Sequence, residues 1–321
     1  MQNVNISVLE CIATLGIVAV IPSLLTGPTF TIQSFGTGSL THIIYMIIIG
    51  SAFFSLLFGL FLKFKGMDIV DISEVAGGRF LKYFTGITII LYLMLTVILA
   101  LSEFTENIRN ILFENAPTEY FYLIFYVGIL ISVLIGIRGI FRASTILAPI
   151  IILGVIFIFF SLYSDIDITN FTPIMGNSIK EFFIPGSFRL EMFESIFLIL
   201  LMGPQIIHLK KATIGSYILI SLFTLIIAIL LFGIFPYPSS LENYFPLFEL
   251  NRLISFGRFI QRVEAFYILI WLIAMYIYIS LGTSYAVQTF SKLFNLKYTN
   301  RIIPLFCILV VLRSIIFRIL Y

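Results

Sequence analysis

Charged side chains are scarce in this sequence, since only 11% of its 321 residues are Asp, Glu, Lys or Arg, whereas 60% are hydrophobic. Soluble globular domains carry about 25% charged residues, so the composition excludes that class. The mean hydropathy of +1.11 instead indicates an integral membrane protein. The net charge is +3, but the lysines and arginines are scattered among short segments, so we expect no nucleic-acid partner.

The chain also has few of the residues that catalytic and metal sites use, with two cysteines and two histidines. Cys11 and Cys307 lie in apolar runs, where a free cysteine behaves as a small hydrophobic residue, so we expect neither a disulfide nor a metal site. The sequence has no nucleophile elbow and no phosphate-binding loop, because Gly-Gly-Arg at 77–79 is not followed by Lys-Ser or Lys-Thr. We therefore predict that the protein is not an enzyme and has no catalytic residue and no cofactor.

Long apolar runs are abundant, such as GITIILYLMLTVILALS at 86–102. A helix needs roughly 20 apolar residues to cross a hydrocarbon core of about 30 Å, whereas the strands of a β-barrel would alternate apolar and polar residues. We therefore predict an all-α, polytopic membrane protein in which residues 1–321 form a single transmembrane domain. The nine predicted spans are residues 7–30, 40–62, 83–111, 119–137, 143–163, 187–207, 213–235, 256–282 (with continuation to 292 left open) and 302–320.

Basic residues are distributed unevenly between the loops on the two sides of these spans. If the amino terminus is cytoplasmic, the inside loops hold most of the lysines and arginines, including Lys65, Arg142 and Lys211, whereas the outside loops hold mainly acidic residues such as Asp167. Short basic loops stay on the cytoplasmic side of a membrane. We therefore predict a cytoplasmic amino terminus, and we expect no cleavable signal peptide because the first ten residues lack a basic region.

Glycine and proline interrupt two of the predicted spans. The first contains Gly16, Pro22 and a Gly-Pro pair at 27–28, and the sixth is framed by a Pro-Gly pair at 185–186 and a Gly-Pro pair at 203–204. Proline removes a helical donor, so such segments kink or unwind. Two broken helices five spans apart are typical of transporters with an inverted repeat, which bind substrate at the breaks. Glycine and proline are also common in membrane helices without this role, which leaves a second interpretation open.

Four segments resemble one known family in the same order along the chain. They read DISEVAGGRFLKYFTG, NFTPIMGNSIKEFF, MGPQIIHLKKA and FIQRVEAFYILIW, and the last is the most specific. They are similar to the B subunit of spore germinant receptors (the GerAB type), a branch of the amino acid/polyamine/organocation permease superfamily. The resemblance implies a LeuT-like fold of ten helices and a location in the spore inner membrane. It also implies that the protein senses an amino acid or similar germinant together with A and C subunits.

The sequence departs from this family in two respects. Members usually have a tenth helix, whereas this chain ends at Tyr321, so we expect a bundle of about nine helices without the tenth. The family also places an aromatic residue followed by glycine or glutamate where helix six unwinds. Counting back from Pro204 places that point at Phe197, whereas counting forward from Phe193 places it at Glu194, and both remain open.

The two breaks predict where a ligand binds. Unwound backbone at 16–19 would offer free N–H groups to a carboxylate, and carbonyl groups at 193–195 would accept from an ammonium group. The ligand-binding residues predicted at these breaks are Gly16, Ile17, Val18, Ala19, Phe193, Glu194 and Ser195.

A stripe of aromatic residues in the eighth span adds to this prediction. Glu264, Trp271, Tyr278 and Tyr285 follow one another at seven-residue steps, which drift by only about 20° around a helix. A carboxylate facing lipid near the bilayer centre costs about 2.5–3.5 kcal/mol, so Glu264 should face protein or water. We predict that Trp271 and Tyr278 contact the ligand and that Glu264 acts as an outer gate. A structural hydrogen bond of Glu264 is the alternative.

Three functions are consistent with these patterns. The first is a receptor subunit that binds a small germinant and signals to partner subunits. The second is a secondary transporter of amino acids driven by an ion gradient. The third is a scaffold subunit whose ligand site is vestigial.

Overall fold

The computed structural model describes residues 5–25, 27–64, 66–113, 116–176, 194–242, 245–255, 263–296 and 299–320. Within these ranges the chain is almost entirely helical and has no β-strand, only an isolated bridge between Ile6 and Ile206. The predicted all-α fold is confirmed. The α-helices are α1 (Val8–Leu24), α2 (Gly27–Phe35), α3 (Ser39–Lys63), α4 (Ile69–Leu112), α5 (Thr118–Ile135), α6 (Ile137–Leu162), α8 (Glu194–Met202), α9 (Leu209–Ile234), α10 (Pro246–Arg252), α11 (Val263–Leu293) and α12 (Ile303–Leu320).

Most of the predicted spans coincide with single helices. The second, fourth, fifth, seventh and ninth correspond to α3, α5, α6, α9 and α12. The eighth corresponds to α11, which continues to Leu293, so the longer alternative is confirmed. In the described part of the chain, six helical stretches are long and apolar enough to cross a membrane, and two shorter apolar helices begin at Val8 and Ile303.

The third span begins earlier than predicted, because α4 starts at Ile69 rather than at 83. Asp68 caps this helix: its carboxylate accepts hydrogen bonds from the N–H groups of Val70 and Asp71, each at 3.0 Å. The Asp71 side chain in turn accepts from the Asp68 N–H, which completes a capping box. The helix kinks at the glycine pair 77–78, whose second member has a φ of +69°. The predicted loop is therefore a helical arm that precedes the span.

The break in the first span also lies elsewhere than predicted. Helix α1 runs without interruption through 16–19, so the expectation of unwound backbone there was wrong. No strong helix breaker occurs in α1 before Pro22, and the chain leaves the helix at Leu25, which has extended angles. Helix α2 then begins at Gly27, so helix one is broken one or two turns later than the sequence indicated.

Only the last part of helix six falls within the described residues. It comprises α8 and a 3₁₀ turn at 203–205, and Phe193 lies outside the described residues. The predicted breaker at 203–204 does end the α-helix. The next residues pair with the start of the chain, because the Ile6 N–H donates to the Gln205 carbonyl at 2.7 Å and the Ile6 carbonyl accepts from the Ile207 N–H at 2.8 Å.

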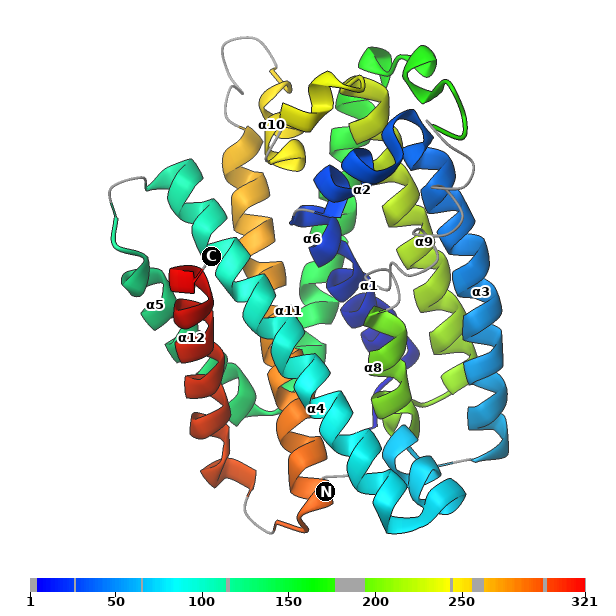
Figure 1. Ribbon diagram of the computed structural model, residues 1–321, viewed down its shortest axis with the longest axis vertical. Coiled ribbons are helices and arrows are strands. Elements are labelled where there is room, and N and C mark those ends of the chain that lie inside the picture. Colours follow the sequence, from blue (N-terminus) through cyan, green and yellow to red (C-terminus); the bar gives the residue numbers. More distant parts are fainter. Residues whose placement is uncertain are drawn as a thin grey trace.

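The helices form a bundle with α1 and α11 near its middle and with α3 and α12 towards opposite edges (Figure 1). Helix α11 packs along α4 and also contacts α1, α5 and α6, while α1 packs against α9 and α6. The apolar window of α11 is 61% buried, compared with 17% for the stretch that contains α6. Helix α11 is therefore a central helix, and much of α6 faces outward.

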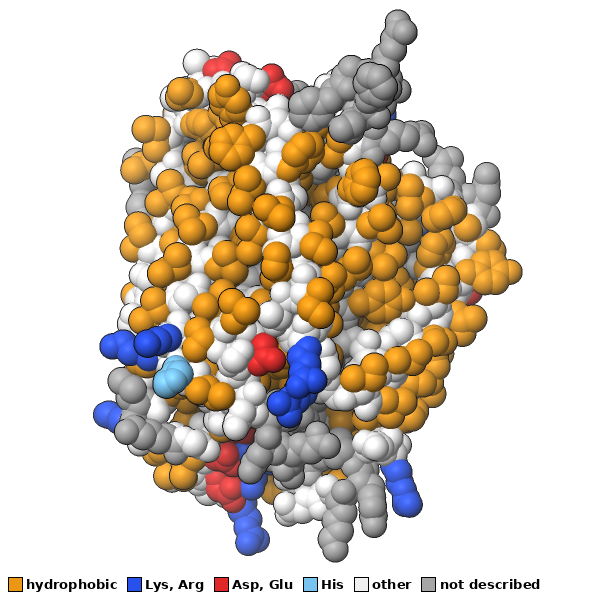
Figure 2. All heavy atoms as spheres, turned by 180° about the vertical axis from the view of Figure 1, so that it is seen from behind, with side chains coloured by type: hydrophobic (Ala, Val, Ile, Leu, Met, Phe, Trp, Pro, Cys, Tyr) orange, Lys and Arg blue, Asp and Glu red, His pale blue; other side chains and the backbone are white. Residues whose placement is uncertain are grey.

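The outer surface of the bundle is apolar over most of its height. In Figure 2 hydrophobic side chains cover the middle of the molecule, and most of the charged side chains visible in this view lie towards its two ends. The exposed hydrophobic side chains include Leu91 of α4, Leu134 of α5 and Phe160 of α6. A belt of this kind is expected where lipid tails replace water. The protein is an integral membrane protein.

Candidate functional site

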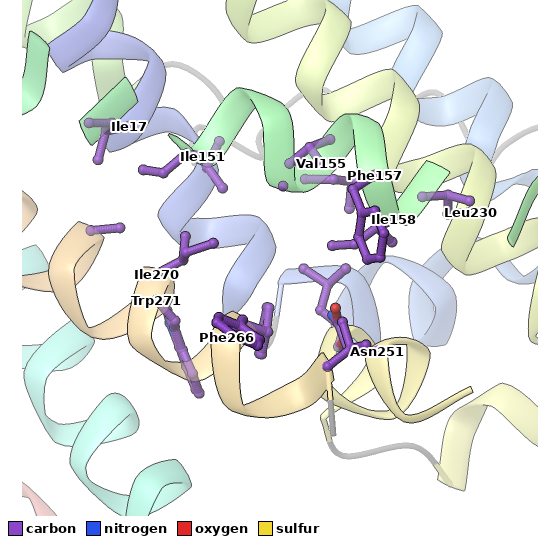
Figure 3. Close-up of a pocket in the computed structure, with 17 residues that line it drawn as sticks. Ile17, Ile151, Val155, Phe157, Ile158, Leu230, Asn251, Phe266, Ile270 and Trp271 are labelled. Carbon is purple, nitrogen blue, oxygen red and sulfur yellow. The ribbon is translucent and has the colours of Figure 1, made fainter. Parts of the chain in front are cut away.

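A cavity of about 240 Å³ lies between α1, α6, α9, α10 and α11. Figure 3 shows its walls: Ile151, Val155 and Ile158 project from α6, with Ile270 and Trp271 of α11 on the other side. An engineered cavity of about 150 Å³ can hold a benzene molecule. This cavity therefore has room for a small ligand with one ring or a short branched chain.

Helical periodicity explains why these residues share one cavity. The lining residues of α6 include Ile151, Val155 and Ile158, which are spaced by four and three residues and so lie on one face. Those of α11 include Trp271 and Ala274, three residues apart. Gly154 belongs to the same wall. A Cβ atom there would lie 3.3 Å from the Ile270 Cδ1, so the glycine permits close approach of α6 and α11.

Three buried side chains with a polar group border the cavity, namely Asn251, Tyr267 and Trp271. The indole of Trp271 is 1% exposed and packs edge-on against Phe104 of α4, with ring centroids 4.7 Å apart. Its Nε1–H has no hydrogen-bond partner among the described residues. Asn251 of α10 is also 1% exposed and donates from Nδ2 to the Leu247 carbonyl at 2.7 Å. Its Oδ1 is likewise without a partner in the described ranges, and both unpaired atoms are buried.

Of the four residues predicted at the first break, one lines the cavity. Ile17 lines the cavity together with Val20, whereas Gly16 faces α9, where an added Cβ would lie 2.7 Å from Leu219 Cδ2. Pro22 has no N–H, so the Val18 carbonyl lacks its donor within the helix. The predicted free donors at 16–19 are not formed, because these residues lie inside α1. Ala19 is partly buried and does not line the cavity.

The residues predicted at the second break are helical where they are described. Glu194 and Ser195 are the first described residues of helix six and belong to α8. Carbonyl groups in the first turn of a helix accept from N–H groups four residues later, and only the N–H groups lack partners. The expected free carbonyls at these two positions are therefore not formed, because both residues are helical. Phe193 lies outside the described residues, so the proposed role of the second break remains a prediction.

The aromatic stripe of α11 faces the interior of the bundle. Trp271, Tyr278 and Tyr285 are 1%, 6% and 2% exposed, and the Tyr285 hydroxyl lies 3.4 Å from Gln205 Oε1. Of these three side chains, only Trp271 lines the cavity. Tyr278 lies two turns further along the helix, so its contact with a ligand remains a prediction.

Glu264 lies at the beginning of α11 and is partly buried. Its neighbour Val263 lines the cavity, so the carboxylate is close in sequence to the site without being part of its wall. An acidic residue in the first turn of a helix is favoured by the helix dipole. Its action as a gate remains a prediction.

Sequence reasoning did not identify Asn251. The segment between the seventh and eighth spans was treated as a loop, but it forms α10, which begins at Pro246 and buries Leu247 and Leu250. Proline at the first position of a helix followed by apolar residues three apart is a sequence signal for a short buried helix. That signal was present in PLFELNR.

Comparisons with known proteins agree with this architecture. Residues 5–319 match the sequence profile of a family described as "Spore germination protein". The chain belongs to this family. It is 28% identical over 251 residues to spore germination protein XB of Bacillus anthracis. The aligned region covers 74% of this chain and 67% of that protein. The chain is thus a germination-related membrane protein of the permease type.

The fold resembles that of a solved transporter. A Na⁺-coupled sialic acid symporter, in a substrate-bound outward-open state, superposes with a TM-score of 0.65 over 97% of this chain and 72% of its own. The sequence identity is 15%, so the likeness concerns the fold alone. The predicted LeuT-like bundle is confirmed.

Proposed function

We propose that this chain is the membrane subunit of a spore germinant receptor, which binds a small germinant and passes a conformational change to its partners. The observation that supports this function is the cavity, because Ile17 and Trp271, predicted as ligand residues from two distant spans, both line it. The resemblance supplies the other parts of the proposal. The partners are the A and C subunits, the location is the spore inner membrane with the amino terminus in the cytoplasm, and the germinant is an amino acid or a similar small molecule.

A ligand in this cavity would bias the packing of five helices at once. A ligand shifts a conformational equilibrium by the difference in its affinity for the two states. Two of these helices, α1 and α11, are tied to neighbouring segments at the end of the bundle where α1 begins. The residues that precede α1 are hydrogen-bonded to the segment after α8, and the last turn of α11 is ion-paired with the start of α4. We expect the A and C subunits to detect the change at that end.

A secondary transporter of amino acids is the alternative function. The fold similarity to a Na⁺-coupled symporter over 97% of the chain supports it. In that case the cavity would be one substrate-binding site along a transport path. A scaffold subunit with a vestigial site is the third candidate, and it predicts no ligand binding.

Filling the cavity tests the receptor function. Ala274 lines the cavity and is 1% exposed, whereas Leu269 on the same helix is 58% exposed on the apolar surface. We expect Ala274→Phe spores to need at least about tenfold more germinant, because the phenyl ring occupies the ligand's place, while Leu269→Phe spores respond normally at equal protein level. A normal response of Ala274→Phe spores would exclude the cavity as the germinant site.

Two further measurements separate the alternatives. Uptake of labelled amino acids by proteoliposomes that contain only this chain would establish a transporter. Saturable germinant binding without uptake supports the receptor subunit, and the absence of both supports the scaffold.

A further inference from the structure

The open space of the cavity is bounded by hydrocarbon. Of the 17 residues that line it in the described part of the chain, all but Asn251, Tyr267 and Trp271 have hydrocarbon side chains or none. The unpaired atoms Asn251 Oδ1 and Trp271 Nε1 are buried and are not accessible from the open space. A water molecule needs about two to four polar partners, and an apolar cavity of about 150 Å³ stays dry. The space therefore suits a hydrocarbon group rather than water.

The rim of the cavity belongs to the apolar outer surface of the bundle. Phe157 of α6 and Phe266 of α11 line the cavity, yet they are 42% and 67% exposed. Figure 3 shows these two side chains on α6 and α11, on opposite sides of the cavity. Phe160 and Leu269, three residues further along the same two helices, are 68% and 58% exposed and continue this surface. The cavity therefore meets the hydrocarbon region of the bilayer between α6 and α11.

The volume of the cavity corresponds to part of a lipid tail. A cavity of about 150 Å³ holds benzene, with its six carbon atoms, so the cavity of about 240 Å³ holds roughly ten carbon atoms by proportion. The bilayer interior is itself apolar, so the hydrophobic effect does not favour entry of a tail. Dispersion does favour it, because the atoms of the wall gain close partners that a void does not supply. A tail beside the rim also sheds no water when it enters.

We propose that the cavity is a binding site for one acyl chain of a membrane lipid, which enters from the bilayer between Phe157 and Phe266. This site does not depend on the receptor function and goes beyond it, since the bilayer rather than the germinant supplies the ligand. If the germinant uses the same space, the two ligands exclude each other. The lipid composition of the membrane then changes the germinant concentration that the protein needs.

The single tryptophan of the chain provides the assay, because Trp271 lines the cavity and is 1% exposed. Bromine quenches indole fluorescence on close approach. The purified chain is placed in nanodiscs of phosphatidylcholine with brominated acyl chains and, for comparison, in nanodiscs of the unbrominated lipid. We expect Trp271 to lose fluorescence in the brominated bilayer by a fraction comparable to that of a lipid-facing reference, Leu269→Trp in a Trp271→Phe chain. Unchanged Trp271 fluorescence would overturn the assignment.

Two substitutions fill the cavity from opposite walls. Ala274→Phe projects from α11 and Val155→Phe from α6, and both positions line the space. We expect either one to abolish quenching of Trp271 by the brominated lipid, whereas Leu269→Phe on the outer surface leaves it unchanged. Quenching that persists in both filled variants would mean that bromine reaches the indole from the outer surface, and the acyl-chain site would be wrong. A thermal unfolding profile shared with the parent chain excludes misfolding, and if one variant does not fold, the other gives the comparison.

The acyl-chain site and the receptor function fail under different outcomes. If the brominated lipid does not quench Trp271 but Ala274→Phe spores lose their germinant response, the acyl-chain site is wrong and the receptor function remains supported. If quenching depends on the open cavity but Ala274→Phe spores germinate normally, the cavity holds a lipid tail and is not the germinant site. The fluorescence of the purified chain and the response of the spores are therefore separate tests.

Discussion

Replacement of Lys292 should loosen the end of the bundle where α1 begins. Its ammonium group lies 2.5 Å from Asp68 Oδ2 and 2.6 Å from Asp71 Oδ1, so the last turn of α11 is bound to the first turn of α4. Lys292→Met keeps the length of the side chain and removes the charge. The capping bonds that Asp68 accepts from the α4 backbone remain, so α4 should still begin at the same residue.

The size of the effect follows from the partial burial of this cluster. The side chains of Lys292 and Asp68 are 14% and 17% exposed, and that of Asp71 is 34% exposed. Exposed ion pairs contribute about 0–1 kcal/mol, whereas removing one partner of a buried pair costs about 3–5 kcal/mol. The variant also leaves two adjacent carboxylates that repel each other. We therefore expect Lys292→Met to lower the free energy of unfolding by about 2 kcal/mol, between these limits.

Thermal unfolding in nanodiscs measures the loss, with Lys210→Met as the matched control because Lys210 is exposed at the start of α9. Asp68→Asn preserves a good helix cap, so a double-mutant cycle with Lys292→Met isolates the ion pair. Limited proteolysis of the arm at 69–77 should become faster in Lys292→Met alone. If Lys292→Met and Lys210→Met unfold alike and the cycle gives no coupling, the cluster does not stabilise this end.

Three further predictions concern α1, the membrane orientation and α11. Gly16→Leu should destabilise the protein by about 1–3 kcal/mol, because the new side chain overlaps Leu219. Thermal unfolding measures this loss, and unchanged stability would contradict the packing of α1 against α9. Single cysteines in place of Arg142 should react with an impermeant maleimide only from the cytoplasmic side, and those in place of Asp167 only from outside, and reversed labelling would refute the predicted orientation. Glu264→Gln should shift the germinant concentration dependence if the carboxylate is a gate, and an unchanged dose response at equal protein level favours the structural alternative.

The places of most predicted spans agree with single helices because each span carries its own signal. A run of apolar residues long enough to span a bilayer must become a helix wherever it lies, since no other structure satisfies its backbone there. The start of α4 was missed because Asp68 and Asp71 stand in a polar segment that reads as a loop, although they form a capping box. The break of helix one was misplaced because the sequence shows several candidate breakers, and only packing decides which one acts.

Some residues that line the candidate cavity also carry a local signal in the sequence. Trp271 and Ile17 were identified from a seven-residue stripe and from a broken span, and both line the cavity. Gly16 was assigned to the ligand although it faces α9, because a sequence does not say towards which neighbour a glycine points. Asn251 was missed because its helix is short and separated from the spans.

The amino-acid sequence by itself determined the membrane location, the all-α class, the order of the spans and the permease family. These properties depend on composition, on local periodicity and on short segments that resemble a family without reference to the rest of the chain. The tertiary structure alone decided that α1, α6, α9, α10 and α11 line one cavity and that Lys292 of α11 forms an ion pair with Asp68 at the start of α4. Those contacts join residues far apart in the chain. Which faces meet is set by packing between helices, and no local pattern contains that information.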